Sequence, residues 1–416
     1  MDSRGNPTIA ATVTVEVGYQ GMAMVPSGAS TGSYEAVELR DSDPKRYNGL
    51  GVLIAVANVN EKIAVALQGH DVSDQVGLDQ KMIELDNTDN KGNLGANAIL
   101  AVSLACARAA AAAKGEPLYR HLASIYPGFD GRFVMPLPML NILNGGKHAN
   151  WATDIQEYMI LPVGANDIAE AVRMGAEIYQ SLKKVLKSKG YSLNVGDEGG
   201  FAPAVKSNEE AFQLLVQATE GAGYQPGKDV VFGIDAAATE FLSGGEYSLN
   251  KEGMKMDGAQ LAAFYSDLIA RYPIVSLEDV FAEDDWDSFC AFTAQHPGRQ
   301  IVGDDLYVTN VERLKKGVEK GASNAILIKL NQIGTLTETM AAIQLAHESG
   351  FKAVISHRSG ETEDSFIADL AVATAAGQIK TGAPARSERT SKYNRLMEIA
   401  AELGDEAPLA NFPFLA

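Results

Sequence analysis

Five short apolar runs in the chain end at charged residues, and this feature constrains the fold more than any other. The runs VVFGID, PIVSLED, RQIVGDD, NAILIK and QIK bring in, in order, Asp235, Glu278, Asp304, Lys329 and Lys380. From Glu278 onward these positions, with Ser356 between the two lysines, recur at intervals of about 25 residues. Strand-like runs at this interval, separated by helical patterns, indicate βα units and a parallel sheet. In a closed βα barrel the residues at the carboxyl ends of the strands carry the chemistry, so we predict an active site there.

The length and the order of patterns indicate two domains. A chain of 416 residues with 46% hydrophobic and 21% charged residues is long enough for a barrel and a second core. Residues 8–25 alternate as in a β-hairpin, and helical patterns follow to about residue 125, which favours a small α+β domain. The segment 124–138 is rich in Pro, Gly and aromatic residues, as inter-domain boundaries often are. We therefore predict domains over residues 1–125 and 126–416.

The charge and the cysteines exclude several classes of protein. A net charge of −18 argues against nucleic-acid binding, which requires a basic face. Cys106 and Cys290 form neither a disulfide framework nor a metal-ligand spacing, so we expect a reducing, cytoplasmic setting. The first residues, MDSRGNPT, lack the apolar segment of a secretory signal. We predict that the Ala-rich segment 98–115 is a buried helix rather than a membrane span.

The acids and lysines at the strand ends suggest metal-assisted chemistry. Each of Asp235, Glu278 and Asp304 alone is explained by a helix cap or a lysine partner. Three together would repel one another, and their oxygen ligands suit Mg²⁺, so for the set we favour a metal site. Lys329 is either a general base, with a pKa lowered by desolvation and bound cations, or a counter-ion of the acids; from the residue alone the two are equally favoured. Lys380 is a candidate ligand for an anionic substrate group.

Four loops add candidates of lower specificity. SHRSGETED, residues 356–364, carries Arg358 beside a hydroxyl and suits a phosphate or carboxylate, although it is also a plausible helix start. Glu198 in GDEGG and His148 in NGGKHAN, taken alone, are an acidic turn and a surface histidine. SGASTG, residues 27–32, lacks the GK[ST] ending of a nucleotide-binding loop and instead resembles a mobile lid.

Together these motifs resemble the enolase family over essentially the whole chain. The resemblance rests on DSRGNPT, PSGASTG, GANAILAVSLA, VGDEGG, SLED, VGDD, LIKLNQIGTLTET, SHRSGETED and QIKTGAPARSER. It implies an α/β fold in which a small N-terminal α+β domain caps a modified, TIM-like (βα)₈ barrel with an antiparallel second strand. The implied reaction is that of a glycolytic lyase, the reversible dehydration of 2-phospho-D-glycerate to phosphoenolpyruvate. Two Mg²⁺ ions are implied, the second arriving with substrate.

The resemblance also implies roles, position by position. It assigns metal binding to Asp235, Glu278, Asp304 and Ser30. It assigns catalysis to Lys329 as the base, to Glu198 as the acid, and to His148 and Glu157 beside the leaving group. It assigns substrate binding to Gln156, His357, Arg358, Ser359 and Lys380.

The same resemblance implies a cytoplasmic homodimer or an octamer built from dimers. Family members carry roughly one more strand before DSRGNPT, so we expect a weaker sheet or weaker dimerisation here. Two other functions stay open at this point. One is a related lyase or racemase acting on another carboxylate, which the Arg358–Ser359 pair argues against. The other is a non-catalytic protein that kept the fold.

Overall fold

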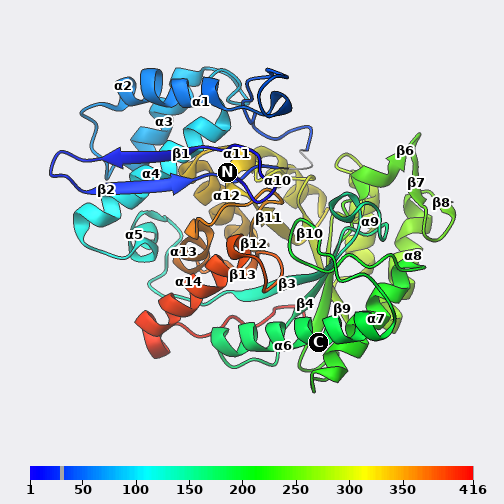
Figure 1. Cartoon of the computed structure of the whole chain (residues 1–416). Coiled ribbons are helices and arrows are strands. Elements are labelled where there is room, and N and C mark those ends of the chain that lie inside the picture. Colours follow the sequence, from blue (N-terminus) through cyan, green and yellow to red (C-terminus); the bar gives the residue numbers. More distant parts are fainter. Residues whose placement is uncertain (29–31, 416) are drawn as a thin grey trace.

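The centre of the molecule is a closed barrel of eight strands (Figure 1). The computed structural model describes residues 1–28 and 32–415. Around the barrel the strands follow the order β10 (Gln300–Gly303), β11 (Ala325–Ile328), β12 (Lys352–Ser356), β13 (Gly377–Lys380), β3 (Leu137–Asn144), β4 (Glu157–Leu161), β5 (Val231–Asp235) and β9 (Ile274–Glu278). The predicted TIM-like α/β barrel is confirmed.

Strand β4 runs against its neighbours. It pairs antiparallel with both β3 and β5, whereas the other neighbouring strands of the barrel pair in parallel. The expectation of an antiparallel second strand is therefore correct. Its consequence is that Glu157, the first residue of β4, lies opposite Asp235, the last residue of β5. The carboxyl-end face of the barrel thus receives one acid from the start of a strand.

Apolar side chains fill the interior of the barrel. Leu137, Met139, Met159, Leu161, Val231, Val275, Val302, Ala325, Leu327, Val354 and Phe412 form one buried cluster. Ten of these eleven come from the strands, and Phe412 comes from the C-terminal segment. Phe412 is only 5% exposed, so this ring closes the barrel core. Chemistry is thereby confined to the strand ends, because the interior is packed rather than hollow.

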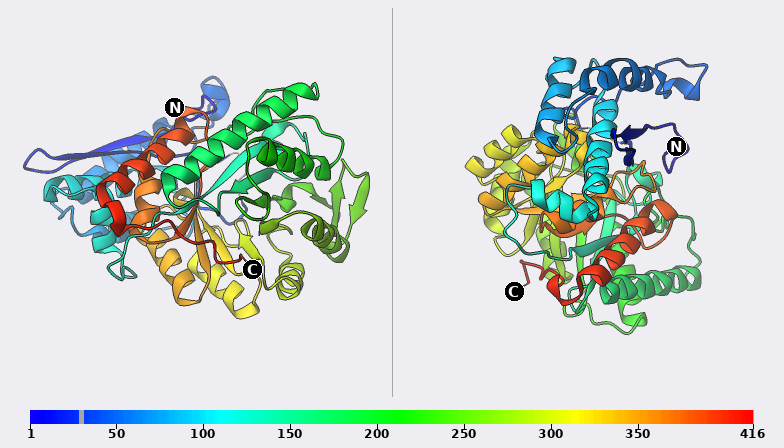
Figure 2. Two further views of the ribbon diagram at one scale, coloured as in Figure 1. Left: turned by 90° about the horizontal axis from the view of Figure 1, so that it is seen from below. Right: turned by 90° about the vertical axis from the view of Figure 1, so that its left-hand side faces the viewer.

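Helices surround the barrel. They are α6 (Ile168–Ser188), α7 (Asn208–Gly221), α8 (Gly258–Arg271), α9 (Trp286–Gln295), α10 (Val311–Lys320), α11 (Leu330–Ile333), α12 (Leu336–Glu348), α13 (Phe366–Ala373) and α14 (Ser387–Leu403), with short 3₁₀ turns at Lys147–Ala149, Ala238–Phe241 and Gly404–Glu406. Helix α14 lies along α6 (Figure 2). A small sheet of β6 (Leu242–Ser243), β7 (Glu246–Leu249) and β8 (Met254–Met256) stands beside α8.

The N-terminal part is a hairpin packed on helices. It contains β1 (Ala10–Thr14), β2 (Gln20–Met24), α1 (Leu53–Ala57), a π-helical turn Asn58–Ile63, α2 (Ala64–Leu67), α3 (Gln75–Asp86), α4 (Ala96–Lys114) and α5 (Leu118–Ile125), with a 3₁₀ turn at Tyr47–Gly49. The predicted hairpin and the predicted α+β character are confirmed. The boundary between residues 125 and 126 stays a prediction; it falls where α5 ends, before β3 begins.

Helix α4 is the centre of the N-terminal domain. Among the described residues it is the one helix long and apolar enough to cross a membrane by length and composition, and 83% of its most apolar window is buried in the protein. It therefore serves as a core helix, as predicted for segment 98–115. Strand β2 crosses it so closely that a Cβ on Gly21 would overlap the backbone of Ala105 and Ala109. Only glycine fits this crossing.

A partly buried ion pair joins the two domains beside the barrel mouth. Both carboxylate oxygens of Asp364 accept hydrogen bonds from Arg108 of α4, at 2.7 and 2.6 Å. The backbone N–H of Met24 also donates to Asp364, at 2.8 Å. Farther along the junction, Asp79 of α3 accepts from the Thr337 backbone N–H at 2.9 Å, at the start of α12. The hairpin and α4 are thus fixed against the loop that carries Arg358.

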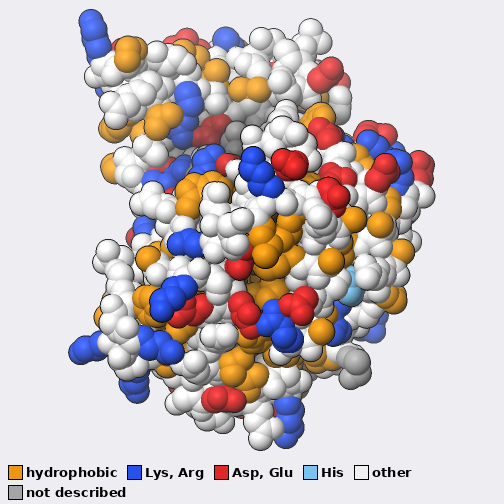
Figure 3. Space-filling model, turned by 90° about the vertical axis from the view of Figure 1, so that its right-hand side faces the viewer, with side chains coloured by type: hydrophobic (Ala, Val, Ile, Leu, Met, Phe, Trp, Pro, Cys, Tyr) orange, Lys and Arg blue, Asp and Glu red, His pale blue; other side chains and the backbone are white. Residues whose placement is uncertain are grey.

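Charges on the face that carries β6, β7 and β8 are mixed. Lysine and arginine side chains alternate with aspartate and glutamate over that face (Figure 3). The face carries no continuous basic surface, and the absence of nucleic-acid binding stays a prediction.

Candidate active site

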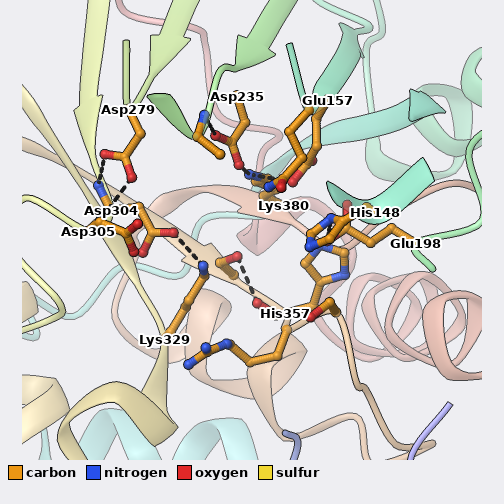
Figure 4. A pocket seen from close by; sticks show the side chains of 15 residues that line it. His148, Glu157, Glu198, Asp235, Asp279, Asp304, Asp305, Lys329, His357 and Lys380 are labelled. Carbon is orange, nitrogen blue, oxygen red and sulfur yellow. Dashed lines mark hydrogen bonds and ion pairs between the residues drawn. The ribbon is translucent and has the colours of Figure 1, made fainter. Parts of the chain in front are cut away.

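The carboxyl ends of the barrel strands surround one cavity (Figure 4). Its lining residues are His148, Gln156, Glu157, Glu198, Asp235, Ala237, Asp279, Asp304, Asp305, Lys329, Ser356, His357, Arg358, Ser359 and Lys380. The structure therefore brings together eleven of the thirteen predicted site residues. Of the other two, Glu278 is fully buried next to the cavity, and Ser30 lies outside the described residues.

Lys380, the last residue of β13, stands at the centre of the acids. Its ammonium Nζ lies 2.7 Å from Glu278 Oε1, 3.0 Å from Asp235 Oδ2 and 3.0 Å from Glu157 Oε1. Burial opposes the charged form of this lysine, but the carboxylates outweigh it and raise its pKa well above the ordinary value. Lys380 is therefore a permanent cation that partly compensates three acids.

The acids Asp235, Glu278 and Asp304 fit a hard divalent cation. Asp235 and Glu278 lie in register on adjacent strands, and Asp304 directly follows β10 beside them. Burial, and next to it repulsion from Asp235, raises the pKa of Glu278 well above its ordinary value. The Glu278 Oε2 atom is buried without a hydrogen-bond partner among the described residues. An unpartnered oxygen in an all-oxygen set is the chemistry that Mg²⁺ prefers.

Asp279 orients the backbone of the neighbouring acids Asp304 and Asp305. Its two carboxylate oxygens accept from the backbone N–H groups of Asp304 at 2.8 Å and of Asp305 at 2.9 Å. Ligand atoms of Asp279, Asp304 and Asp305 lie within 4.8 Å of one another. Burial, followed by repulsion from Asp304, raises the pKa of Asp305 to about 8. Excess negative charge thus collects on this side of the cavity.

Lys329 forms an ion pair with Asp304 Oδ2, while Asp304 Oδ1 accepts from Gln332 Nε2 at 2.8 Å. Burial disfavours the ammonium of Lys329, but the negative charge of Asp304 outweighs this effect and raises its pKa. The protein's own side chains therefore raise the pKa of Lys329, and the lowered pKa that we expect beside bound cations stays a prediction. The strand end faces an acid directly, and the ion pair with Asp304 is compatible with both interpretations of Lys329, a counter-ion of the acids or a general base.

Glu198 lies across the cavity from Lys329, between two histidines (Figure 4). Its Oε1 is 3.5 Å from His148 Nδ1 and 3.6 Å from His357 Nε2, and its Oε2 accepts from Asn141 Nδ2 at 2.7 Å. Although burial opposes ionisation, the two histidines hold the pKa of Glu198 well below its ordinary value. The interpretation of His148, taken alone, as a surface histidine is wrong, because its side chain is only 5% exposed. The Gly-rich turn folds it inward.

Domain-family comparisons cover nearly all of the chain. Residues 1–122 match the family model described as "Enolase, N-terminal domain". Residues 132–415 match "Enolase, C-terminal TIM barrel domain". The chain belongs to the enolase family. The motifs from DSRGNPT to QIKTGAPARSER that carry the resemblance thus lie within the two matched enolase domains.

In this enolase-family chain, the arginine predicted to clamp an anion is held by an acid from the N-terminal domain. Arg358 donates from Nη1 to Glu35 Oε2 at 2.8 Å and to Asn331 Oδ1 at 2.9 Å. Its Nη2 donates to Glu35 Oε1 at 3.2 Å. Glu35 follows the SGASTG loop closely in the chain. Ser33, between that loop and Glu35, donates from its hydroxyl to Glu283 Oε1 at 2.6 Å. The segment after that loop is therefore anchored to the barrel.

A second arginine of the enolase barrel holds the loop 357–359 in place. The fully buried Arg389 of α14 donates to His357 Nδ1, to the Arg358 carbonyl at 2.6 Å, to the Ser359 carbonyl at 2.7 Å and to the Asp197 carbonyl at 3.1 Å. Because a guanidinium only donates, His357 Nδ1 accepts and its Nε2 carries the proton that faces Glu198. Burial, and next to it Arg389, lowers the pKa of His357 well below its ordinary value.

The sequence-based reasoning missed several residues of this enolase site: Glu35, Asn141, Asp279, Asp305, Gln332 and Arg389. A weak signal existed for two of them, because Asp279 and Asp305 are the second acids of SLED and GDD. The others come from a loop, a strand and two helices, and their residue types carry no chemical pattern. Only their position in space reveals them.

Proposed function

We propose that this protein catalyses the reversible dehydration of 2-phospho-D-glycerate to phosphoenolpyruvate. The observation that carries the proposal is that a lysine and a glutamate, Lys329 and Glu198, line the same cavity from different sides, next to Arg358 and Ser359. Elimination of water across a carbon–carbon bond requires a base at one carbon and an acid at the other. Membership of the enolase family over nearly the whole chain supports this reaction.

In the proposed reaction Lys329, as the free amine, removes the proton from C2 of the substrate. The electron pair of that bond forms the C2–C3 double bond, and the C3 hydroxyl leaves as water with a proton from Glu198. His148, Gln156 and Glu157 line the cavity on the side of this leaving group. In the reverse direction the two proton transfers exchange their roles.

The substrate's two anionic groups require separate partners. Arg358 and Ser359, with His357 beside them, would bind the phosphate, because a guanidinium and backbone amides suit its oxygens. Lys380 would stabilise the charge that develops on the carboxylate when the C2 proton leaves. Binding of phosphate requires that Arg358 share or exchange its contact with Glu35.

The cofactor in this proposal is Mg²⁺, two ions for each site. Asp235, Glu278 and Asp304 would hold the first ion, and Ser30 the second when substrate binds. Mg²⁺ bound there would supply positive charge opposite the substrate carboxylate and would compete with Lys329 for Asp304. We also propose that the protein acts in the cytoplasm, in glycolysis, as a homodimer or an octamer of dimers.

The test follows the ultraviolet absorbance of the enol phosphate formed from 2-phosphoglycerate, in Mg²⁺ and in EDTA. We expect turnover in Mg²⁺, none in chelator, and at least a roughly 1,000-fold loss of kcat in Lys329→Ala, about 4 kcal/mol of barrier. Arg358→Gln should raise KM most strongly. Full activity in EDTA, or turnover of a non-phosphorylated acid in preference to 2-phosphoglycerate, would contradict the proposal.

A further inference from the structure

A second cavity opens at the amino ends of the barrel strands, opposite the candidate active site. It has a volume of about 570 Å³, which is within the range of small-molecule pockets. Lys352 and Gly377, the first residues of β12 and β13, line this amino-end cavity. Ser356 and Lys380, the last residues of the same strands, line the barrel-mouth cavity. Because packed side chains fill the barrel between the two ends, the amino-end cavity is a separate site.

The walls of the amino-end cavity are fixed by contacts within the protein. The C-terminal segment is bonded to Met135, whose N–H donates to the Pro408 carbonyl at 2.9 Å and whose carbonyl accepts from the Ala410 N–H at 2.9 Å. Gln378 also lines the cavity and is 2% exposed. Its side-chain amide exchanges two hydrogen bonds of 2.8 Å with that of Gln300. The cavity is therefore preformed, and a ligand does not have to order its walls.

Positive charge gathers in this cavity, although the protein has a net charge of −18. The lining includes Arg132, His347 and Lys352, against Asp130 as the single acid. Arg132 Nε already donates to Asp130 at 3.0 Å, so this acid does not neutralise the other groups. In the described part of the chain the Lys352 ammonium makes neither an ion pair nor a hydrogen bond. A lysine without a partner in a recess is suited to bind an anion.

His347 places a second nitrogen donor near Lys352. Its Nδ1 lies 3.2 Å from the Tyr126 hydroxyl, and no described residue bonds its Nε2. Burial, and next to it the charge of Lys352, lowers the pKa of His347. The positive charge of Lys352 thus reaches the imidazole without an acid to offset it. An anion bound by both groups would compensate this charge.

Apolar side chains form much of the remaining wall. Phe129, Val134, Phe351, Ala376 and Pro413 are among the lining residues. A small inorganic anion would leave this apolar surface in contact with water. An anion carried on an aromatic body would cover the surface, and burial of apolar area favours binding.

We propose that the amino-end cavity binds a small organic anion, a carboxylate on an aromatic body. Lys352 and His347 hold the carboxylate, and the apolar wall covers the body. A few polar groups in a mostly apolar recess are the usual arrangement of a small-molecule site. The proposal does not rest on the proposed reaction, because no residue of the barrel-mouth cavity takes part.

The test is titration calorimetry of the full-length protein near neutral pH with three matched probes. Naphthoate carries both the charge and the aromatic body, naphthalenemethanol lacks the charge, and acetate lacks the body. We expect a single site for naphthoate, with Kd at least about fivefold higher for each of the other two. Lys352→Gln should raise the naphthoate Kd at least about fivefold, with an unchanged thermal midpoint to verify the fold. Lys255→Gln, which alters an exposed lysine of β8 outside the cavity, is the control and should leave Kd unchanged.

Crystals soaked with naphthoate should show its carboxylate beside Lys352. The inference is overturned if naphthoate does not bind, if naphthalenemethanol binds equally well, or if Lys352→Gln keeps the parental Kd. It is also overturned if affinity falls in Arg358→Gln and not in Lys352→Gln, which would place the anion at the barrel mouth. None of these results depends on turnover of 2-phosphoglycerate, so failure of the proposed reaction and failure of this site are separate outcomes.

Discussion

Replacement of Arg389 by methionine tests how much of the site depends on a side chain that touches no expected substrate atom. In the folded protein Arg389 is fully buried and satisfies the His357 ring nitrogen and the carbonyls of Arg358, Ser359 and Asp197. Methionine keeps much of the volume and removes every donor. Three buried acceptors and the partly buried Asp197 carbonyl then compete for whatever water enters.

The magnitude follows from these contacts. Each buried acceptor left unsatisfied costs about 1–3 kcal/mol, and water recovers part of that cost. A total of about 3–5 kcal/mol is therefore expected for the loop 357–359 and its junction with the loop of Glu198. If about 3 kcal/mol of this appears in the transition state, kcat/KM falls more than 100-fold. Arg389→Lys, which keeps the charge and part of the donor set, should retain intermediate activity.

The assay is kcat and KM for 2-phosphoglycerate, with circular dichroism to verify the fold. Arg395→Met is the matched control, because Arg395 lies on the same helix and pairs with Asp369 at 2.8 Å, away from the cavity. We expect the control to stay within about twofold of the parent in kcat/KM. A folded Arg389→Met variant with parental kcat/KM would refute the reasoning, because it would show that the loop keeps its geometry without the guanidinium.

Three further predictions concern stability, each read as a thermal midpoint. Asp364→Asn should lower the free energy of unfolding by about 2 kcal/mol, since it leaves the partly buried Arg108 without its anion. An unchanged midpoint would show that the ion pair adds nothing to stability. Phe412→Ala should cost about 3–5 kcal/mol of stability, because it leaves a cavity at the end of the barrel core that Phe412 closes. Leu415→Ala is the control and should change little, because Leu415 is 44% exposed; equal effects would show that Phe412 does not close the core. Burial, and next to it Lys352, lowers the pKa of His347, so the folded protein binds this proton more weakly than the unfolded chain does. The stability that neutral His347 contributes is therefore present above its unfolded pKa and is lost as the pH falls through the lower folded pKa. His347→Gln should therefore lose less stability than the parent between about pH 7 and 5, and parallel pH curves would contradict this.

The strand ends are where sequence and structure agree best. Strands β5, β9 and β13 end at Asp235, Glu278 and Lys380, and Lys329 directly follows β11, each as the runs indicate. The physical reason is that a buried strand is a local pattern of apolar, β-branched residues. Its end is marked by the first residue that cannot be buried cheaply. The repeat of that pattern then fixes the barrel and the face on which the charged residues gather.

What the sequence by itself determined is therefore the α/β barrel, its N-terminal companion, and the set of side chains at the barrel mouth. Tertiary structure alone decided which of these side chains meet. Arg358 is 323 positions from Glu35 in the chain, and Lys380 is 145 from Asp235, so no local pattern records these pairs. The ion pair of Lys329 with Asp304 is likewise set by the tertiary structure. A pKa depends on burial and on the nearest charges in space, and for Lys329 the nearest charge is Asp304, which closure of the barrel brings to it.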